Sequence, residues 1–92
     1  MTKNPNKLQA ARLHKGLSVA QVASYIGLKN EETLQRWENG DTLPSTPFAF
    51  KLCALYGVSV GDLYPEICKR IAKEMAPEIK QAMSKKLKLK KL

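Results

Sequence analysis

The central part of the chain carries apolar residues at a helical period. Four of them occupy positions i, i+3, i+4 and i+7 of one helix face: Val19, Val22, Ala23 and Ile26. Ser18 precedes this run and Gln21 follows Ser18 by three residues, which is the spacing of a capping box at the start of a helix. Gly27 comes directly after the last apolar position, where glycine can end a helix in the left-handed conformation. The pattern predicts a helix over 19–26.

A second helix is expected after a short turn. Asn30 is the best available N-cap and Gly40 the natural C-terminal stop, so we expect this helix over 31–39, with Leu28 closing the turn onto the core. Leu34 and Trp37 are three residues apart and face inward. The outer face then carries four polar side chains: Glu31, Glu32, Gln35 and Arg36. These either touch a partner or form a solvated face.

Similar signals predict three more helices in the first two thirds of the chain. We expect them over about 5–15, from Ser45 to Gly57, and over 60–64. Their caps and stops are, in chain order, Asn4 ahead of Pro5, then Ser45-Thr46-Pro47 and Gly57, then Ser59 and Pro65. Five short helices that are each half apolar must pack on one another. The predicted fold class is all-α, a compact five-helix domain followed by a C-terminal amphipathic helical extension.

The extension keeps an apolar spacing of four residues. The two apolar stripes are Ile67, Ile71 and Met75, then Ile79, Met83 and Leu87. We expect two amphipathic helices, over 66–75 and from 78 to about 89, interrupted at Pro77. Ile67 and Ile71 would finish the core, whereas the second stripe would form a dimer contact or a frayed tail. This divides the chain into a domain over 1–64 and a lysine-rich extension over 65–92.

Several residues between Leu8 and Leu63 occur in an order and at a spacing typical of one family. They are Arg12, Gly16-Leu17-Ser18, Val22-Ala23, Ile26-Gly27-Leu28, Leu34, Arg36-Trp37-Glu38-Asn39-Gly40, Pro44, Leu52, Ala54-Leu55-Tyr56-Gly57-Val58-Ser59 and Asp62-Leu63. Through these residues the chain resembles the phage-repressor and Cro-like helix-turn-helix regulators, the XRE family, with the motif at about 18–40. The resemblance covers roughly 60% of the chain.

The resemblance implies that the helix over 31–39 enters the major groove of double-stranded DNA and reads base edges with its first turn. Carried over by position, the base-reading residues are Asn30, Glu31, Glu32, Gln35 and Arg36. Arg36 can donate two hydrogen bonds to guanine, Asn30 or Gln35 can pair with adenine, and a glutamate can accept from cytosine N4. We assign phosphate positioning to Gln21, Lys29, Thr33 and Asn39. The family's internal ion pair corresponds here to Arg12 and Glu38, to which we assign a structural role.

The chain departs from the family pattern in three places. The interval from Gly27 to Trp37 is one residue longer than usual, which leaves the register of the reading helix open at Asn30. Val19 stands where relatives carry a phosphate-bracing glutamine. The loop after Gly40 is often basic in relatives, but here it carries an aspartate and no cation.

The charge is concentrated in the extension. Residues 1–64 hold seven Lys or Arg against five acids, a net of +2, whereas residues 65–92 hold nine against three, a net of +6. Phosphate contacts supply much of the affinity for DNA, so a domain of +2 should bind weakly as a monomer. We therefore expect a homodimeric transcriptional regulator, a repressor on an inverted repeat whose two reading helices lie about 34 Å apart.

The sequence favours no catalytic or cofactor chemistry. Cys53 and Cys68 lie fifteen residues apart without a CxxC motif, and His14 is the one histidine, so neither a zinc site nor a redox pair is predicted. There is no nucleophile with a matching base and no phosphate-cradling glycine loop, which argues against an enzyme. No segment reaches the ~18 apolar residues of a membrane span, and the N-terminal residues lack an apolar signal core. We expect a cytoplasmic protein without a cofactor, and no membrane binding by default.

Two alternatives remain open. In one, the protein is an antitoxin-type autoregulator whose extension, over 66–89, binds a partner protein. In the other, the protein is a protein-protein adaptor that retains the fold without reading DNA, which Val19, Asp41 and the Glu31-Glu32 pair favour.

Overall fold

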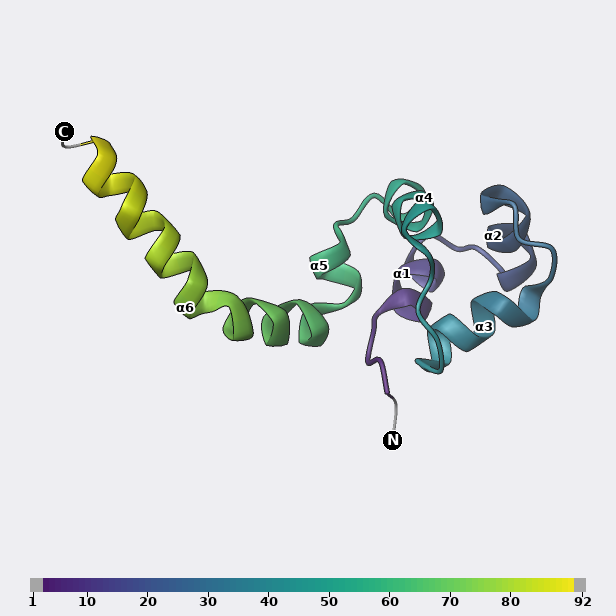
Figure 1. Ribbon diagram of the computed structural model, residues 1–92. Helices are drawn as coiled ribbons and strands as arrows, with labels where there is room; N and C mark the ends of the chain where they lie inside the picture. Colours follow the sequence, from purple (N-terminus) through teal and green to yellow (C-terminus); the bar gives the residue numbers. More distant parts are fainter. Residues whose placement is uncertain (1–2, 91–92) are drawn as a thin grey trace.

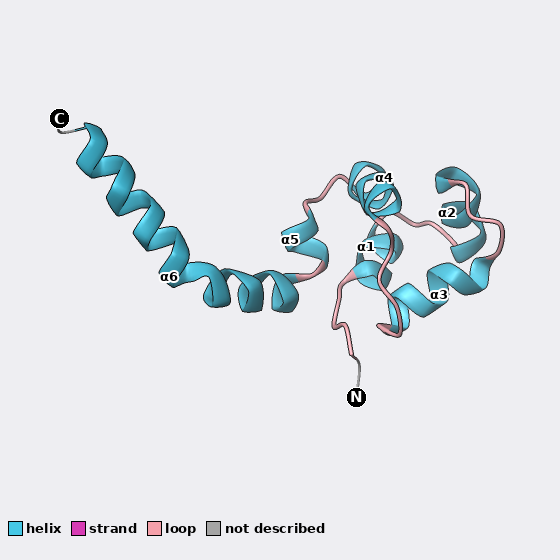
Figure 2. Ribbon diagram, viewed as in Figure 1, coloured by secondary structure: helices cyan, strands magenta, loops and turns pink. Residues whose placement is uncertain are grey.

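The structure, a computed structural model, describes the backbone over residues 3–90 and the side chains over residues 3–77. Its described part is helical without strands. The helices are α1 (Leu8–His14), α2 (Val19–Ile26), α3 (Glu31–Asn39), α4 (Thr46–Tyr56), α5 (Val60–Leu63) and α6 (Pro65–Lys90). Helices α1 to α5 gather into a head, and α6 projects from it on the side away from α2 and α3 (Figures 1 and 2). The predicted all-α class is confirmed.

The core of the head is built from one large side chain of each of four helices. The four largest side chains that are fully buried are Leu8 of α1, Val22 of α2, Leu34 of α3 and Leu52 of α4. Burying an aliphatic side chain of this size is worth roughly 1.5–3 kcal/mol, so each helix gains stability only by packing on the others. Around these four lie further buried side chains, namely Ile26, Trp37, Tyr56, Leu63 and Tyr64.

The predicted ends of α2 follow from local hydrogen bonds. The amide of Gln21 donates to Ser18 Oγ over 3.1 Å, and the amide of Ser18 donates to Gln21 Oε1 over 2.9 Å. Gly27 ends the helix at φ +84°, in the left-handed region. The predicted capping box and glycine stop are both confirmed.

The start of the first helix differs from the prediction. We expected a helix over about 5–15 capped by Asn4, but α1 begins at Leu8. The side chain of Asn4 instead donates to the carbonyl of Gly40 over 3.0 Å. Asn6 Oδ1 accepts from the amide of Leu8 over 3.0 Å. The bond from Asn4 holds the N-terminal segment against the end of α3, and this tertiary contact replaces the first helical turn.

The two prolines near the extension also act differently from the prediction. We expected Pro65 to end the fifth helix after residue 64, but α5 ends at Leu63 and Pro65 begins α6. A proline lacks an N–H, and the first helical position does not need one. Pro77 was expected to separate two helices, but α6 continues through it. One proline removes a single backbone hydrogen bond, and α6 accordingly changes direction along its length without breaking (Figure 1).

The core ends sooner along α6 than predicted. Ile67 packs against the core cluster, but Ile71 is 44% exposed, so the expectation that Ile71 completes the core is wrong. Met75, one turn further, is 45% exposed. The second predicted stripe, formed by Ile79, Met83 and Leu87, lies outside the side chains that the structure describes. Among the described residues, no helix combines the length and the apolar character needed to cross a lipid bilayer.

Candidate nucleic-acid interface

Helices α2 and α3 are joined by a short turn that sets their relative orientation. The amide of Leu28 donates to the carbonyl of Ala23 over 2.8 Å, and the Leu28 side chain packs against the core as predicted. Asn30 caps α3, since its Oδ1 accepts from the amide and the hydroxyl of Thr33 over 3.0 and 2.9 Å. The turn is therefore held at both ends, by a partly buried leucine and by an N-cap.

The two faces of α3 differ in burial as the sequence pattern predicted. Leu34 is fully buried and Trp37 is 5% exposed, with its ring centroid 5.6 Å from that of Phe48 of α4. The outer face carries only exposed side chains: Glu31, Glu32, Gln35 and Arg36. The inner face anchors α3 to the head and leaves the outer face free to contact a ligand.

Arg12 and Glu38 form a buried ion pair between α1 and α3. Arg12 Nε donates to Glu38 Oε2 over 2.7 Å, and Arg12 Nη2 donates to Oε1 over 3.2 Å. A third donor, Nη1, bonds to the carbonyl of Leu17 over 3.0 Å. The hydrogen bonds to Glu38 raise the pKa of Arg12. The ion pair that the resemblance implied is confirmed, and its position inside the head is structural.

A family model described as helix-turn-helix matches residues 8–63, which is more than half of the chain. The chain belongs to the XRE-type helix-turn-helix family. It is therefore a DNA-binding transcription regulator of that type, a family that is generally non-enzymatic. Comparisons with curated proteins and with solved structures each gave no match.

In this helix-turn-helix protein the exposed face of α3 contains an ion pair. Arg36 Nη2 donates to Glu32 Oε1 over 3.0 Å, and the side chains of Arg36 and Glu32 are 59% and 68% exposed. The two residues line a shallow polar hollow of about 200 Å³ together with Asn30 and Thr33. From the sequence we expected Glu32 and Arg36 to act as separate readers, although an acid four residues ahead of a base on a helix is itself a signal for such a pair.

The residues assigned to phosphate positioning have different surroundings. Gln21 is exposed, but its Oε1 accepts from Ser18, which leaves the amide N–H groups to donate. Lys29 is exposed on the turn, Asn39 is exposed at the end of α3, and Thr33 is half-buried with its hydroxyl bonded to Asn30. These four assignments stay predictions.

One residue near the outer face was not predicted from the sequence. Gln9 of α1 is exposed and shares a polar hollow with Gln35 and Asn39 of α3. Nothing in the sequence connects position 9 with position 35, because only the packing of α1 on α3 brings them together.

Several cations of the head near the motif already have partners. Arg12 is paired with Glu38, and Arg36 with Glu32. Lys51 Nζ donates to the carbonyl of Ile26 at the end of α2 over 3.1 Å and lies 5.3 Å from the ring centroid of Phe48. The head therefore has few cations left to offer to phosphates.

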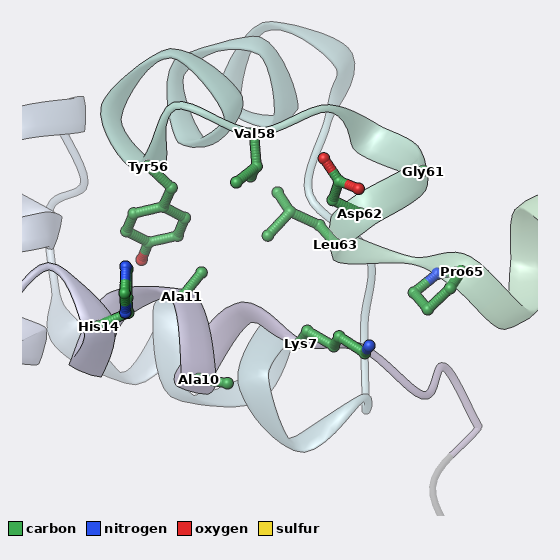
Figure 3. A pocket seen from close by; sticks show the side chains of 10 residues that line it. All are labelled: Lys7, Ala10, Ala11, His14, Tyr56, Val58, Gly61, Asp62, Leu63 and Pro65. Atoms are coloured by element: carbon green, nitrogen blue, oxygen red, sulfur yellow. The ribbon is translucent and has the colours of Figure 1, made fainter.

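A large hollow of the head lies between α1 and the α4–α5 region and is lined by none of the base-reading residues (Figure 3). It has a volume of about 470 Å³, and Tyr56 and Leu63 point toward α1 across it (Figure 3). The Tyr56 hydroxyl is buried without a hydrogen-bond partner among the described residues, and burial raises the pKa of Tyr56 to about 12. His14, the one histidine, is exposed at the rim.

The described side chains hold no cluster of three or more His, Cys, Asp or Glu residues that could bind a metal ion. Cys53 and Cys68 are free thiols, and burial is the main cause that raises the pKa of Cys53. Cys53 packs against the core, as expected of a small apolar residue.

Proposed function

We propose that the protein is a sequence-specific repressor that binds an inverted-repeat operator as a homodimer, with α3 in the major groove. The observation that carries this proposal is the division of α3 into an anchored face and a polar exposed face. Leu34 and Trp37 hold the helix in the head, so its outer side chains keep a constant orientation toward a ligand. A major groove about 12 Å wide admits such a helix.

In this proposal the first turn and outer face of α3 read base edges. Arg36 carries the strongest base-specific chemistry, because a guanidinium can donate two parallel hydrogen bonds to guanine O6 and N7. Asn30 has its Oδ1 engaged in the N-cap, so its amide N–H groups remain to donate. The proposed readers are Asn30, Glu31, Glu32, Gln35 and Arg36. The proposed phosphate contacts are Gln21, Lys29, Thr33 and Asn39.

Two features support a homodimer. Residues 1–64 have a net charge of only +2, so a single head has few cations to offer to phosphates, and two heads would double that number. Ile71 and Met75 are also exposed one turn apart on α6, beyond the point where the core ends at Ile67. Packing this stripe against a second α6 would remove it from water and stabilise a dimer. We assign the dimer contact to the extension, over 65–92.

The test is selection of bound duplexes from a random DNA pool, with the purified full chain at near-physiological salt. The proposal expects enrichment of a palindrome whose half-sites lie about one helical turn apart. Binding that shows no base preference and disappears as salt is raised would overturn it, because phosphate contacts alone behave in that way.

Arg36→Ala examines the reading role more directly. We expect it to relax the preference at one base pair and to cost ~1–3 kcal/mol on the selected operator. Lys29→Ala is the control, since removal of a phosphate-binding side chain should weaken binding to all sequences alike. An equal decrease in affinity for operator and random DNA with Arg36→Ala would contradict its assignment as a reader.

A second candidate function is binding of a partner protein through α6. The same exposed Ile71 and Met75 favour it, with a partner in place of the second copy. This covers an antitoxin-type autoregulator and an adaptor that does not read DNA. Sedimentation equilibrium of the pure protein distinguishes the two, because a chain that stays monomeric at micromolar concentration leaves the stripe for another protein.

A further inference from the structure

We propose that Glu32 is a positioning residue for Arg36. It holds the guanidinium at the N-terminal end of α3 with one complete donor edge free, so that the two residues together recognise a guanine. This inference rests on the proposed function, since it requires that α3 reads base edges. It assigns to Glu32 a role through Arg36 in place of a direct contact with a base.

The geometry of the pair places the guanidinium toward the end of α3 that would enter the groove. Side chains on an α-helix point toward its N-terminus, so Arg36 extends over the preceding turn. There its Nη2 meets Glu32 Oε1 at 3.0 Å. The hollow beside the pair is lined by Asn30 and Thr33, the N-cap and first-turn residues of α3.

The hydrogen-bonding chemistry leaves Arg36 able to bind guanine. A guanidinium has five N–H donors, and Nη2 carries two of them, one directed to each neighbouring edge of the group. Glu32 accepts a single bond from Nη2, so the other Nη2 hydrogen remains, together with the hydrogen of the adjacent nitrogen. Those two parallel donors match guanine O6 and N7. The carboxylate therefore fixes the plane of the guanidinium without occupying both of its edges.

The strength of the pair suits a positioning role. Both side chains are more than half exposed, and exposed pairs at i, i+4 change an equilibrium by only about twofold. Arg36 is therefore not withheld from DNA. When α3 enters a groove and water leaves, the same pair becomes stronger because the surrounding dielectric constant falls.

Glu31 provides a matched control within the same turn. It is exposed, carries the same charge and lies one residue before Glu32, but its side chain makes no hydrogen bond or ion pair with the described residues. Replacing either glutamate removes one negative charge near the phosphates. Only the replacement of Glu32 removes the support of Arg36.

The experiment measures dissociation constants for the selected operator, for the operator changed at the base pair assigned to Arg36, and for random DNA. Four full-length proteins are compared: wild type, Glu32→Ala, Glu31→Ala and Glu32→Gln. We expect Glu32→Ala to lower the discrimination at that base pair by about threefold or more, a part of what a complete arginine–guanine contact provides. Glu31→Ala should leave discrimination unchanged, and both alanine variants should raise affinity for random DNA by a similar factor. Glu32→Gln keeps an acceptor oxygen and should retain part of the discrimination.

Each outcome decides a separate statement. Equal discrimination in Glu32→Ala and Glu31→Ala would overturn the positioning role while leaving the proposed function intact. An effect of Glu32→Ala that persists in an Arg36→Ala background would show that Glu32 contacts a base itself, which also overturns it. A wild-type protein without any base preference would overturn the proposed function and this inference with it. Thermal unfolding of all variants excludes a disrupted fold as the cause.

Discussion

Arg12 uses three of its nitrogen atoms as donors inside the head, two toward Glu38 and one toward the carbonyl of Leu17. Its side chain is 10% exposed and that of Glu38 is 7% exposed. Removing one partner of such a pair leaves a buried charge without compensation, which costs about 3–5 kcal/mol. We expect Glu38→Ala to lower the free energy of unfolding by that amount in a chemical denaturation experiment.

The exposed pair of α3 is the control for this prediction. Glu32→Ala removes an ion pair of similar length whose partners are mostly in water. It should change the free energy of unfolding by less than about 1 kcal/mol. If Glu38→Ala cost no more than Glu32→Ala, burial would not be the reason for the stability of the Arg12–Glu38 pair.

Tyr56 and Tyr64 make the stability of the head sensitive to alkaline pH. Burial raises the pKa of each from 10 to about 12. Below pH 10 both phenols are protonated in the folded and unfolded states, so they contribute no pH dependence there. Between pH 10 and 12 the unfolded state loses these protons first, and stability falls with rising pH. Denaturation measured across this alkaline range should show the fall, and Tyr64→Phe should reduce it.

At the scale of the element, the end of α2 depends on one glycine conformation. Gly27 lies at φ +84°, and an added Cβ would have nothing closer than Lys51 Nζ at 3.9 Å. Space is therefore available, and the cost of Gly27→Ala is the left-handed backbone itself, about 1–2 kcal/mol. Gly61 in α5 is the matched control, because its φ is not in that region and its added Cβ would make an ordinary 3.6 Å contact with Ser59 Oγ. We expect Gly27→Ala to lower the thermal midpoint and Gly61→Ala to leave it unchanged or raise it.

Pro77 determines the continuity of α6. It lies inside the helix, where it cannot donate to the carbonyl four residues earlier. Pro77→Ala should restore that bond and increase the helical circular dichroism signal, since proline is roughly 3 kcal/mol less favourable than alanine in a helix interior. An unchanged signal would mean that α6 gains nothing from the added bond.

Capping signals account for the elements that could be predicted from the sequence. The bounds of α2 and α3 were predicted to the residue, because the side chains that cap them lie within three residues of the helix end. The start of α1 was not, because Asn4 and Asn6 bond to the end of α3, more than thirty residues away. The exposed face of α3 followed from periodicity, whereas the proximity of Gln9 to Gln35 required the packing of α1 on α3.

At the scale of the whole molecule, charge and shape are separated. The molecule measures 57 × 28 × 22 Å, and its length comes from α6, which projects away from α3 (Figure 1). Most of the net charge lies in residues 65–92, at +6. The cations of the extension therefore lie apart from the reading surface of the same head.

Replacing Lys69, Arg70 and Lys73 by glutamine tests what these cations contribute. All three are exposed on the first half of α6. We expect lower affinity for every DNA sequence, with base preference unchanged. The slope of log affinity against log salt concentration should become shallower by about 0.9 for each phosphate that is no longer neutralised. A changed base preference would instead place α6 near the bases.

The sequence by itself determined the helix-turn-helix segment and its exposed face, because caps, glycine stops and apolar periodicity act within a few residues of where they occur. The tertiary structure decided where the N-terminal segment is held, that the core ends at Ile67 rather than Ile71, and that Arg12 and Glu38 are buried together. These features depend on contacts between helices that are distant in the chain, and a local pattern does not specify which distant surface will cover a given residue.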